Sequence, residues 1–140
     1  MRIRKLISAV AVAGAVATAG LATAGNASAF TADCHGGQVC LYYNSSAYGY
    51  GAVYIQNTSI DNYADGNLKF SSGHNGSAGS GVAVKNNAAA VDNHWYGTFN
   101  VYYNSNMDCS VACQPIPMNT RRDLNSALKN NNASGEFVGP

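Results

Sequence analysis

The sequence contains an imperfect internal repeat. The segment 41–45, Leu-Tyr-Tyr-Asn-Ser, returns 60 residues later as Val-Tyr-Tyr-Asn-Ser at 101–105. A second pair of matching blocks, 85–90 and 129–134, starts with Lys-Asn-Asn in both copies and is offset by 44 residues. The first copy therefore carries 16 extra residues, most of them in a Ser-, Gly- and Asn-rich segment, 71–81, that we expect to be a flexible loop. Two copies are too few for a solenoid and predict two units packed together as one domain.

The amino-terminal residues 1–29 have the features of a secretory signal peptide. A basic start is followed by an Ala-, Val- and Gly-rich run and by small residues before a cleavage site after Ala29. The remaining chain, 30–140, has five basic and seven acidic residues and so a net charge of −2. It contains no basic stripe, which disfavours nucleic acid or anionic lipid as a partner. We therefore expect a secreted monomer without stable membrane association.

The four cysteines of the chain predict disulfides, because an even set in an exported protein is normally oxidised. Four cysteines allow three pairings. We favour two bridges that are each local to one copy, although the second would close a tight ring. These are Cys34 with Cys40, and Cys109 with Cys113.

Hydrophobic periodicity indicates β-structure and little helix. Apolar residues alternate with others through 39–43, and in the same phase through 99–103, which is the pattern of half-buried strands. Two more short strands are predicted at 53–55 and 82–84. Pro115 and Pro117 limit their segment to an edge strand or a loop. These patterns predict an antiparallel all-β sandwich.

Two other segments are ambiguous in the sequence. Leu124 and Leu128 have helical spacing within 120–129, but Asn125 and Ser126 weaken a helix, so we expect a short turn. Trp95 is interpreted as a core residue between the two copies rather than as a platform for carbohydrate.

The motifs of the chain resemble those of a known family. A signal peptide, a cysteine six residues before Cys-Leu-Tyr-Tyr-Asn-Ser at 40–45, and Val-Lys-Asn-Asn-Ala-Ala at 84–89 are together similar to secreted actinobacterial proteins of the metallopeptidase-inhibitor family. The resemblance implies one βγ-crystallin-like Greek-key sandwich, made of motifs at about 34–96 and 97–140 and stapled by disulfides. It also implies that the protein is not an enzyme. The implied function is that of a proteinaceous inhibitor of an extracellular metallopeptidase.

The βγ-crystallin-like fold has a repeated calcium signature of two Asn or Asp residues, two free positions, a Ser or Thr, and a Ser. The second copy fits it at five positions, with Asn130, Asn131 and Ser134, but has Gly in the last place. The first copy has Asn86 and Asn87 but no hydroxyl residue at the fifth position, although calcium takes six to eight oxygen ligands. The alternative is that the Asn pairs stabilise β-corners through hydrogen bonds to the backbone. Calcium is the one cofactor that the sequence raises.

An inhibitor that acts by insertion of a substrate-like loop needs a rigid exposed segment. The candidate is the ring of Cys109, Ser110, Val111, Ala112 and Cys113, with Val111 as the bulky apolar residue that thermolysin-like enzymes favour after the scissile bond. The same ring could simply be a stapled hairpin tip. Two other functions stay open: a cell-envelope binding or structural module with weak calcium binding, and a secreted antimicrobial protein similar to killer toxins.

Overall fold

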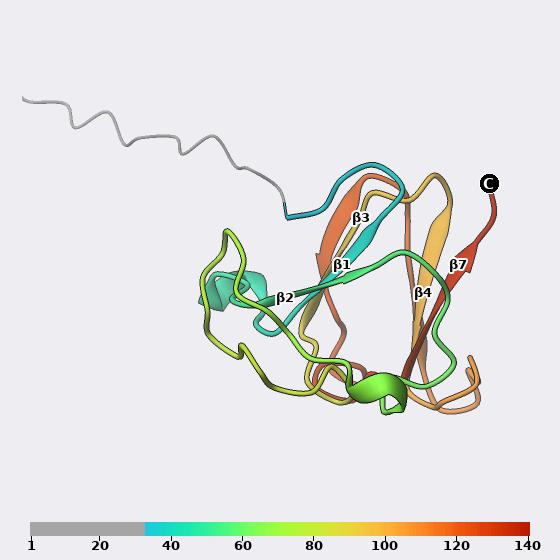
Figure 1. The fold of residues 1–140 in the computed structure, drawn as a ribbon. Helices are drawn as coiled ribbons and strands as arrows, with labels where there is room; N and C mark the ends of the chain where they lie inside the picture. Colours follow the sequence, from blue (N-terminus) through green and yellow to red (C-terminus); the bar gives the residue numbers. More distant parts are fainter. Residues whose placement is uncertain (1–32) are drawn as a thin grey trace, which may run out of the picture.

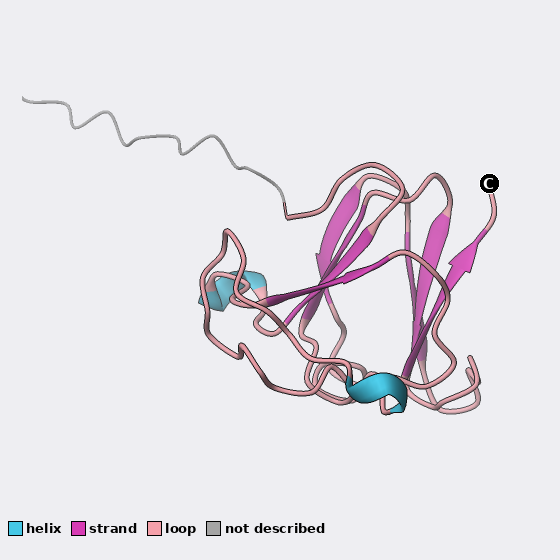
Figure 2. Cartoon of the chain, in the orientation of Figure 1, coloured by secondary structure: helices cyan, strands magenta, loops and turns pink. Residues whose placement is uncertain are grey.

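The computed structural model describes residues 33–140, and the predicted signal peptide lies outside the described residues. This part of the chain folds into two antiparallel sheets with strand orders β2-β1-β3-β6 and β5-β4-β7 (Figure 1). Two short 3₁₀ turns lie in the loops, and Figure 2 shows how much of the chain is loop. The elements are β1 (Val39–Tyr42), η1 (Ser46–Tyr48), β2 (Val53–Gln56), η2 (Asp65–Asn67), β3 (Ala90–Asn93), β4 (Thr98–Tyr102), β5 (Cys113–Ile116), β6 (Thr120–Asp123) and β7 (Ser134–Val138).

The sheets reproduce the internal repeat. Strands β4 and β5 lie 60 residues after β1 and β2, and β7 begins 44 residues after β3. Strand β6 of the second copy pairs with β3 of the first copy, with Ala90 opposite Asp123. In return, Ile60 of the first copy forms an isolated antiparallel bridge with Gly135 of β7. Because Ile60 of the first copy and β6 of the second copy each pair with a strand of the other copy, the two motifs form one domain.

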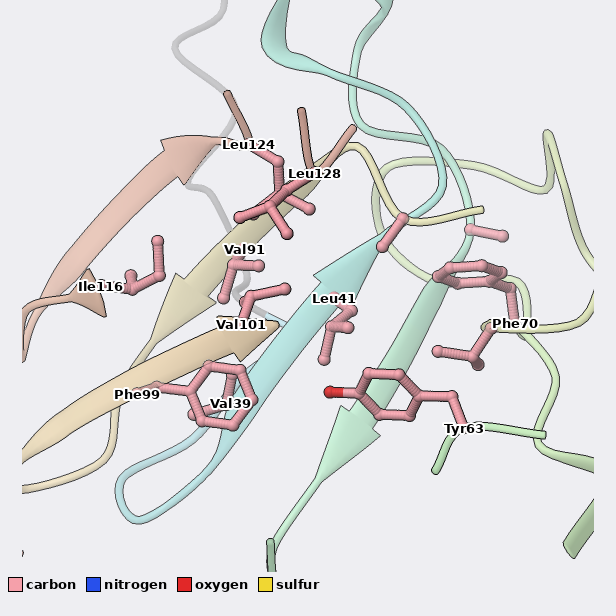
Figure 3. Packing of buried hydrophobic residues seen from close by; sticks show 13 residues of the cluster. Val39, Leu41, Tyr63, Phe70, Val91, Phe99, Val101, Ile116, Leu124 and Leu128 are labelled. Atoms are coloured by element: carbon pink, nitrogen blue, oxygen red, sulfur yellow. The ribbon is translucent and has the colours of Figure 1, made fainter. Parts of the chain in front are cut away.

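The core lies between the two sheets (Figure 3). Leu41 and Val91 enter it from the first sheet, and Phe99 and Val101 enter it from the second. The loops add large side chains, and among them the fully buried Tyr63 donates a hydrogen bond from its hydroxyl to Gln56 Oε1 at 2.8 Å. The remaining labelled core residues in Figure 3 are Val39, Phe70, Ile116, Leu124 and Leu128.

Strand β1 is buried on both faces, so the expectation of a half-buried strand is wrong here. Cys40 and Tyr42 point away from the main core yet are fully buried. The Cys34–Cys40 disulfide covers part of this outer face. The Arg121 guanidinium lies 5.3 Å from the ring centre of Tyr42 and 4.9 Å from that of Tyr50, and it is bonded to the carboxylate of Asp92. The disulfide and the cation–π contacts of Arg121 thus shield the outer face of β1 from solvent.

Two other strand predictions need correction. Segment 82–84 is not a strand, because only Ala83 pairs, in an isolated bridge with Lys69, while Val84 enters the core from a loop. Segment 120–129 begins with strand β6 and continues as a turn, so the expected turn accounts only for its second part. The prediction for Pro115 is confirmed, since β5 is an edge strand of its sheet.

Backbone hydrogen bonds hold the loop 71–81 to Phe70 and to the start of β2, where the N–H of Val53 donates to Ser71 O at 2.8 Å. The N–H of Ala52 donates to Ala78 O at 2.9 Å, and the N–H of Gly81 donates to Phe70 O at 2.8 Å. Gly79 has a positive φ of 87°, and a Cβ there would collide with the Tyr43 ring. A glycine is therefore needed where this loop crosses the ring.

Trp95 lies at the rim of the core and is half-buried. Its ring meets Phe137 of β7 edge to face at 5.3 Å, and its Nε1 donates to Val138 O at 3.3 Å. It therefore packs against the second copy, but at the edge of the sandwich rather than at its centre. Within 33–140, no helix has the length and apolar character to cross a membrane.

Candidate functional sites

The connection between β4 and β5 forms a cross-linked loop at one end of the second sheet. Cys109 and Cys113 are joined by a disulfide, and Cys34 and Cys40 by another, which are the two expected pairs. The N–H of Tyr103 donates to Ala112 O at 3.0 Å and closes the base of the loop. The disulfide and this hydrogen bond fix both ends of the five-residue ring. Disulfides of this kind are typical of an oxidising compartment.

Asp108 braces the ring from inside the loop. Its carboxylate accepts hydrogen bonds from the N–H and the hydroxyl of Ser110, both at 2.8 Å, and from Asn104 Nδ2 at 3.1 Å. These bonds favour the charged form and hold the pKa of Asp108 below its ordinary value, with the backbone N–H of Ser110 as the largest cause. Asp108 was not among the residues predicted from the sequence. The Asp-x-Ser spacing, typical of an Asx turn, was the available signal.

Val111 is the apolar residue that this ring presents to solvent. Its side chain is 62% exposed, whereas Val39, Val84, Val91 and Val101 of the same chain are fully buried. Exposure of one valine is ordinary by itself. Its position in a ring fixed by a disulfide and by Asp108 is what makes it a candidate contact residue.

The two Asn-rich blocks form matching corners. Asn86 and Asn130 have left-handed backbones, with φ of 62° and 60°. The next residue in each copy, Asn87 or Asn131, donates from its side-chain amide to two backbone carbonyls of its own corner. These are the local hydrogen bonds by which Asn stabilises turns, as the structural alternative to calcium binding requires.

The corners of the two copies are also hydrogen-bonded to each other. The N–H of Asn86 donates to Asn132 O, and the N–H of Asn130 donates to Ala88 O, both at 2.8 Å. The buried Asn132 side chain strengthens this contact, because its Oδ1 accepts from the Ala88 N–H at 2.9 Å and its Nδ2 donates to Val84 O at 3.0 Å. The first copy has Ala88 at the position equivalent to Asn132, so only one side chain serves both halves.

The residues of the predicted calcium signature do not fit the ion well. No carboxylate lies in either block, and Ser134 Oγ already donates to Asn104 O and accepts from the Met107 N–H. Beside the corner of the first copy, the Lys85 ammonium donates to Asn62 Oδ1 at 2.9 Å and to Ser105 Oγ at 3.3 Å. An ammonium group repels a divalent cation. Calcium binding stays a prediction that these contacts disfavour.

Residues 33–140 contain no group of three or more His, Cys, Asp or Glu side chains placed to hold a metal ion.

Two sheets, two repeated motifs and an exchanged third strand define a βγ-crystallin-like Greek-key domain. Among solved structures, the chain is similar to one described as "Evolution of the eye lens beta-gamma-crystallin domain fold", with a TM-score of 0.54, 9% identity, and coverage of 76% of this chain and 89% of that one. It is also similar to a βγ-crystallin from Ciona intestinalis, with a TM-score of 0.49, 10% identity, and coverage of 73% and 100%. At such identities the first likeness shows the fold alone. No protein-family model matches the sequence, and no curated protein matches it.

Proposed function

We propose that this protein is a secreted inhibitor of extracellular metallopeptidases that inserts the loop 109–113 into the active-site cleft of its target. The observation that carries the proposal is the exposed Val111 in a ring fixed by the Cys109–Cys113 disulfide and braced by Asp108. The family resemblance of the sequence supports the same function. Export through the amino-terminal signal segment is part of this proposal.

The fixed ring reduces the entropic cost of binding, because few rotations remain to be lost when the loop enters a cleft. The bond offered to the peptidase is Ser110–Val111, with Val111 in the apolar subsite after the scissile bond. The disulfide spans this bond, so hydrolysis would leave both new ends attached to the ring. Loss of the fragments, which normally drives proteolysis forward, is thereby prevented.

The first test measures the residual activity of thermolysin-like, serine and cysteine peptidases titrated with the oxidised protein. We expect stoichiometric loss of activity in the metallopeptidase class alone. Val111→Asp should abolish inhibition, because a carboxylate is costly to desolvate in an apolar subsite. The matched control is Val138→Asp, at a valine that is 37% exposed and lies outside the loop.

Equal loss of inhibition in both variants would contradict the role of the ring. No inhibition by a folded, uncleaved protein would overturn the whole proposal and favour the cell-envelope module. Growth arrest of competing bacteria without peptidase inhibition would favour the antimicrobial alternative.

A further inference from the structure

An open pocket lies beside the corner that Asn130 and Asn131 form. It has a volume of about 300 Å³ and is lined mainly by Tyr43, Asn44, Tyr48, Asn87, Lys129 and Asn130. This volume is at the lower end of the range for small-molecule sites, roughly 300–1,000 Å³. None of the lining residues is acidic. The pocket therefore has room for a ligand of about one sugar ring.

The internal repeat supplies a second copy of this region for comparison. Lys85 is the residue equivalent to Lys129, and its ammonium is bonded to Asn62 Oδ1 and Ser105 Oγ. Asn62 belongs to the same copy as Lys85, and Arg122 is the residue equivalent to it in the second copy, 60 positions later. The residue that supplies an acceptor to Lys85 is therefore replaced in the second copy by a cation, Arg122. Lys129 has no acceptor equivalent to Asn62, and its pocket stays open.

We propose that this pocket binds a sugar that carries a carboxylate. The Lys129 ammonium makes no hydrogen bond or ion pair with another side chain of residues 33–140. It would donate a charge-assisted hydrogen bond to the carboxylate of the sugar. Asn87 Oδ1 offers an acceptor for a hydroxyl group, because Asn87 Nδ2 is already bonded to Ala83 O and Lys85 O, and the side-chain amide of Asn130 offers both donors and an acceptor. Tyr48, on η1 at the rim, is 79% exposed and presents a ring face for stacking.

The carboxylate of Asp123 is bonded to the segment that carries Tyr48. Asp123 accepts hydrogen bonds from the Ser46 N–H at 2.8 Å and from Ser46 Oγ at 2.7 Å, and these bonds hold η1 in place. Asp123 therefore positions the segment that bears Tyr48. The proposed sugar site includes no residue of the ring 109–113. Sugar binding and peptidase inhibition can therefore be tested independently of each other.

The test follows the backbone and side-chain amide resonances of the oxidised protein during titration with D-glucuronate, D-glucose or acetate. We expect saturable shifts at Asn87 and Asn130 with D-glucuronate, and at least about tenfold weaker binding of the other two probes. Lys129→Gln should weaken D-glucuronate binding by about tenfold or more. Lys85→Gln is the matched control, since it removes the equivalent lysine outside the pocket, and it should leave the affinity unchanged.

Three results would overturn the proposal. Absence of saturable shifts with D-glucuronate would show that the pocket takes no such ligand. Equal binding of acetate would show a simple anion site without recognition of the sugar ring. An unchanged affinity in Lys129→Gln, with the dispersed spectrum of a folded protein, would remove the lysine from the site.

Discussion

The contact between the two Asn-rich corners can be tested with Asn132→Ala. The Asn132 side chain is fully buried and bridges the two halves through Ala88 and Val84. Its removal leaves the Ala88 N–H without a partner, which costs about 1–3 kcal/mol. The Val84 carbonyl loses one hydrogen bond, at about 1 kcal/mol, but keeps the one from the Asn87 N–H. We expect the free energy of unfolding to fall by about 2–4 kcal/mol.

The assay is urea unfolding of the oxidised protein followed by Trp95 fluorescence. Asn131→Ala is the matched control, because Asn131 also donates two side-chain hydrogen bonds to backbone carbonyls but is half-buried. Water can replace its bonds, so its loss should cost less than about 1 kcal/mol. Equal destabilisation by the two variants would refute the argument that burial makes the bridging asparagine important.

Three further results are expected. Gly135→Ala should lower the free energy of unfolding by about 1–3 kcal/mol relative to Gly139→Ala in the same urea assay, because a Cβ at Gly135 would clash with the Tyr63 hydroxyl, whereas nothing lies within 4 Å of one at Gly139. Burial raises the pKa of Tyr63 above its ordinary value, so stability should be complete below pH ~10 and fall as the pH rises further; Tyr63→Phe should flatten that fall in alkaline unfolding. The pKa of Asp108 is lowered by its bonds from Ser110, so ordering of the ring should persist above pH ~4 and be lost as the pH falls through the lowered pKa; the Ser110 amide resonance should report this change and be insensitive to acid in Asp108→Asn.

The sequence was a good guide wherever the two copies match. The repeat and its alternating residues located β1 and β4. Pro115 limited its segment to an edge strand or a loop, and the segment is the edge strand β5. Strand β6 was missed because its residues, Thr-Arg-Arg-Asp, have no apolar alternation. It is held by backbone pairing with β3, and a hydrophobic pattern carries no signal for such pairing.

The errors have a common physical cause, which is tertiary contact that a local pattern cannot report. Segment 82–84 alternates like a strand, yet Val84 is apolar because it fills the core from a loop. Tyr42 lies on the polar side of a predicted half-buried strand, yet Arg121 and the Cys34–Cys40 disulfide cover it. The brace at Asp108 and the pocket at Lys129 depend on residues that meet only after folding.

Both proposed sites lie where the two copies differ. The backbone carbonyls of the equivalent residues Tyr42 and Tyr102 accept hydrogen bonds from the N–H groups of Ala89 and Ala133, which lie in the corner of the same copy. Contacts that both copies make in this way stabilise the fold. The ring 109–113 has a disulfide that the first copy lacks at the equivalent positions, and Lys129 lacks the acceptor that Lys85 has. The repeat supplies the frame of the domain. The differences between the copies, a disulfide in one case and a missing acceptor in the other, leave Val111 and Lys129 available to a partner. Substitutions at Val111 and Lys129 should accordingly alter binding while leaving the free energy of unfolding within about 0.5 kcal/mol of the unmodified protein, as urea unfolding can verify.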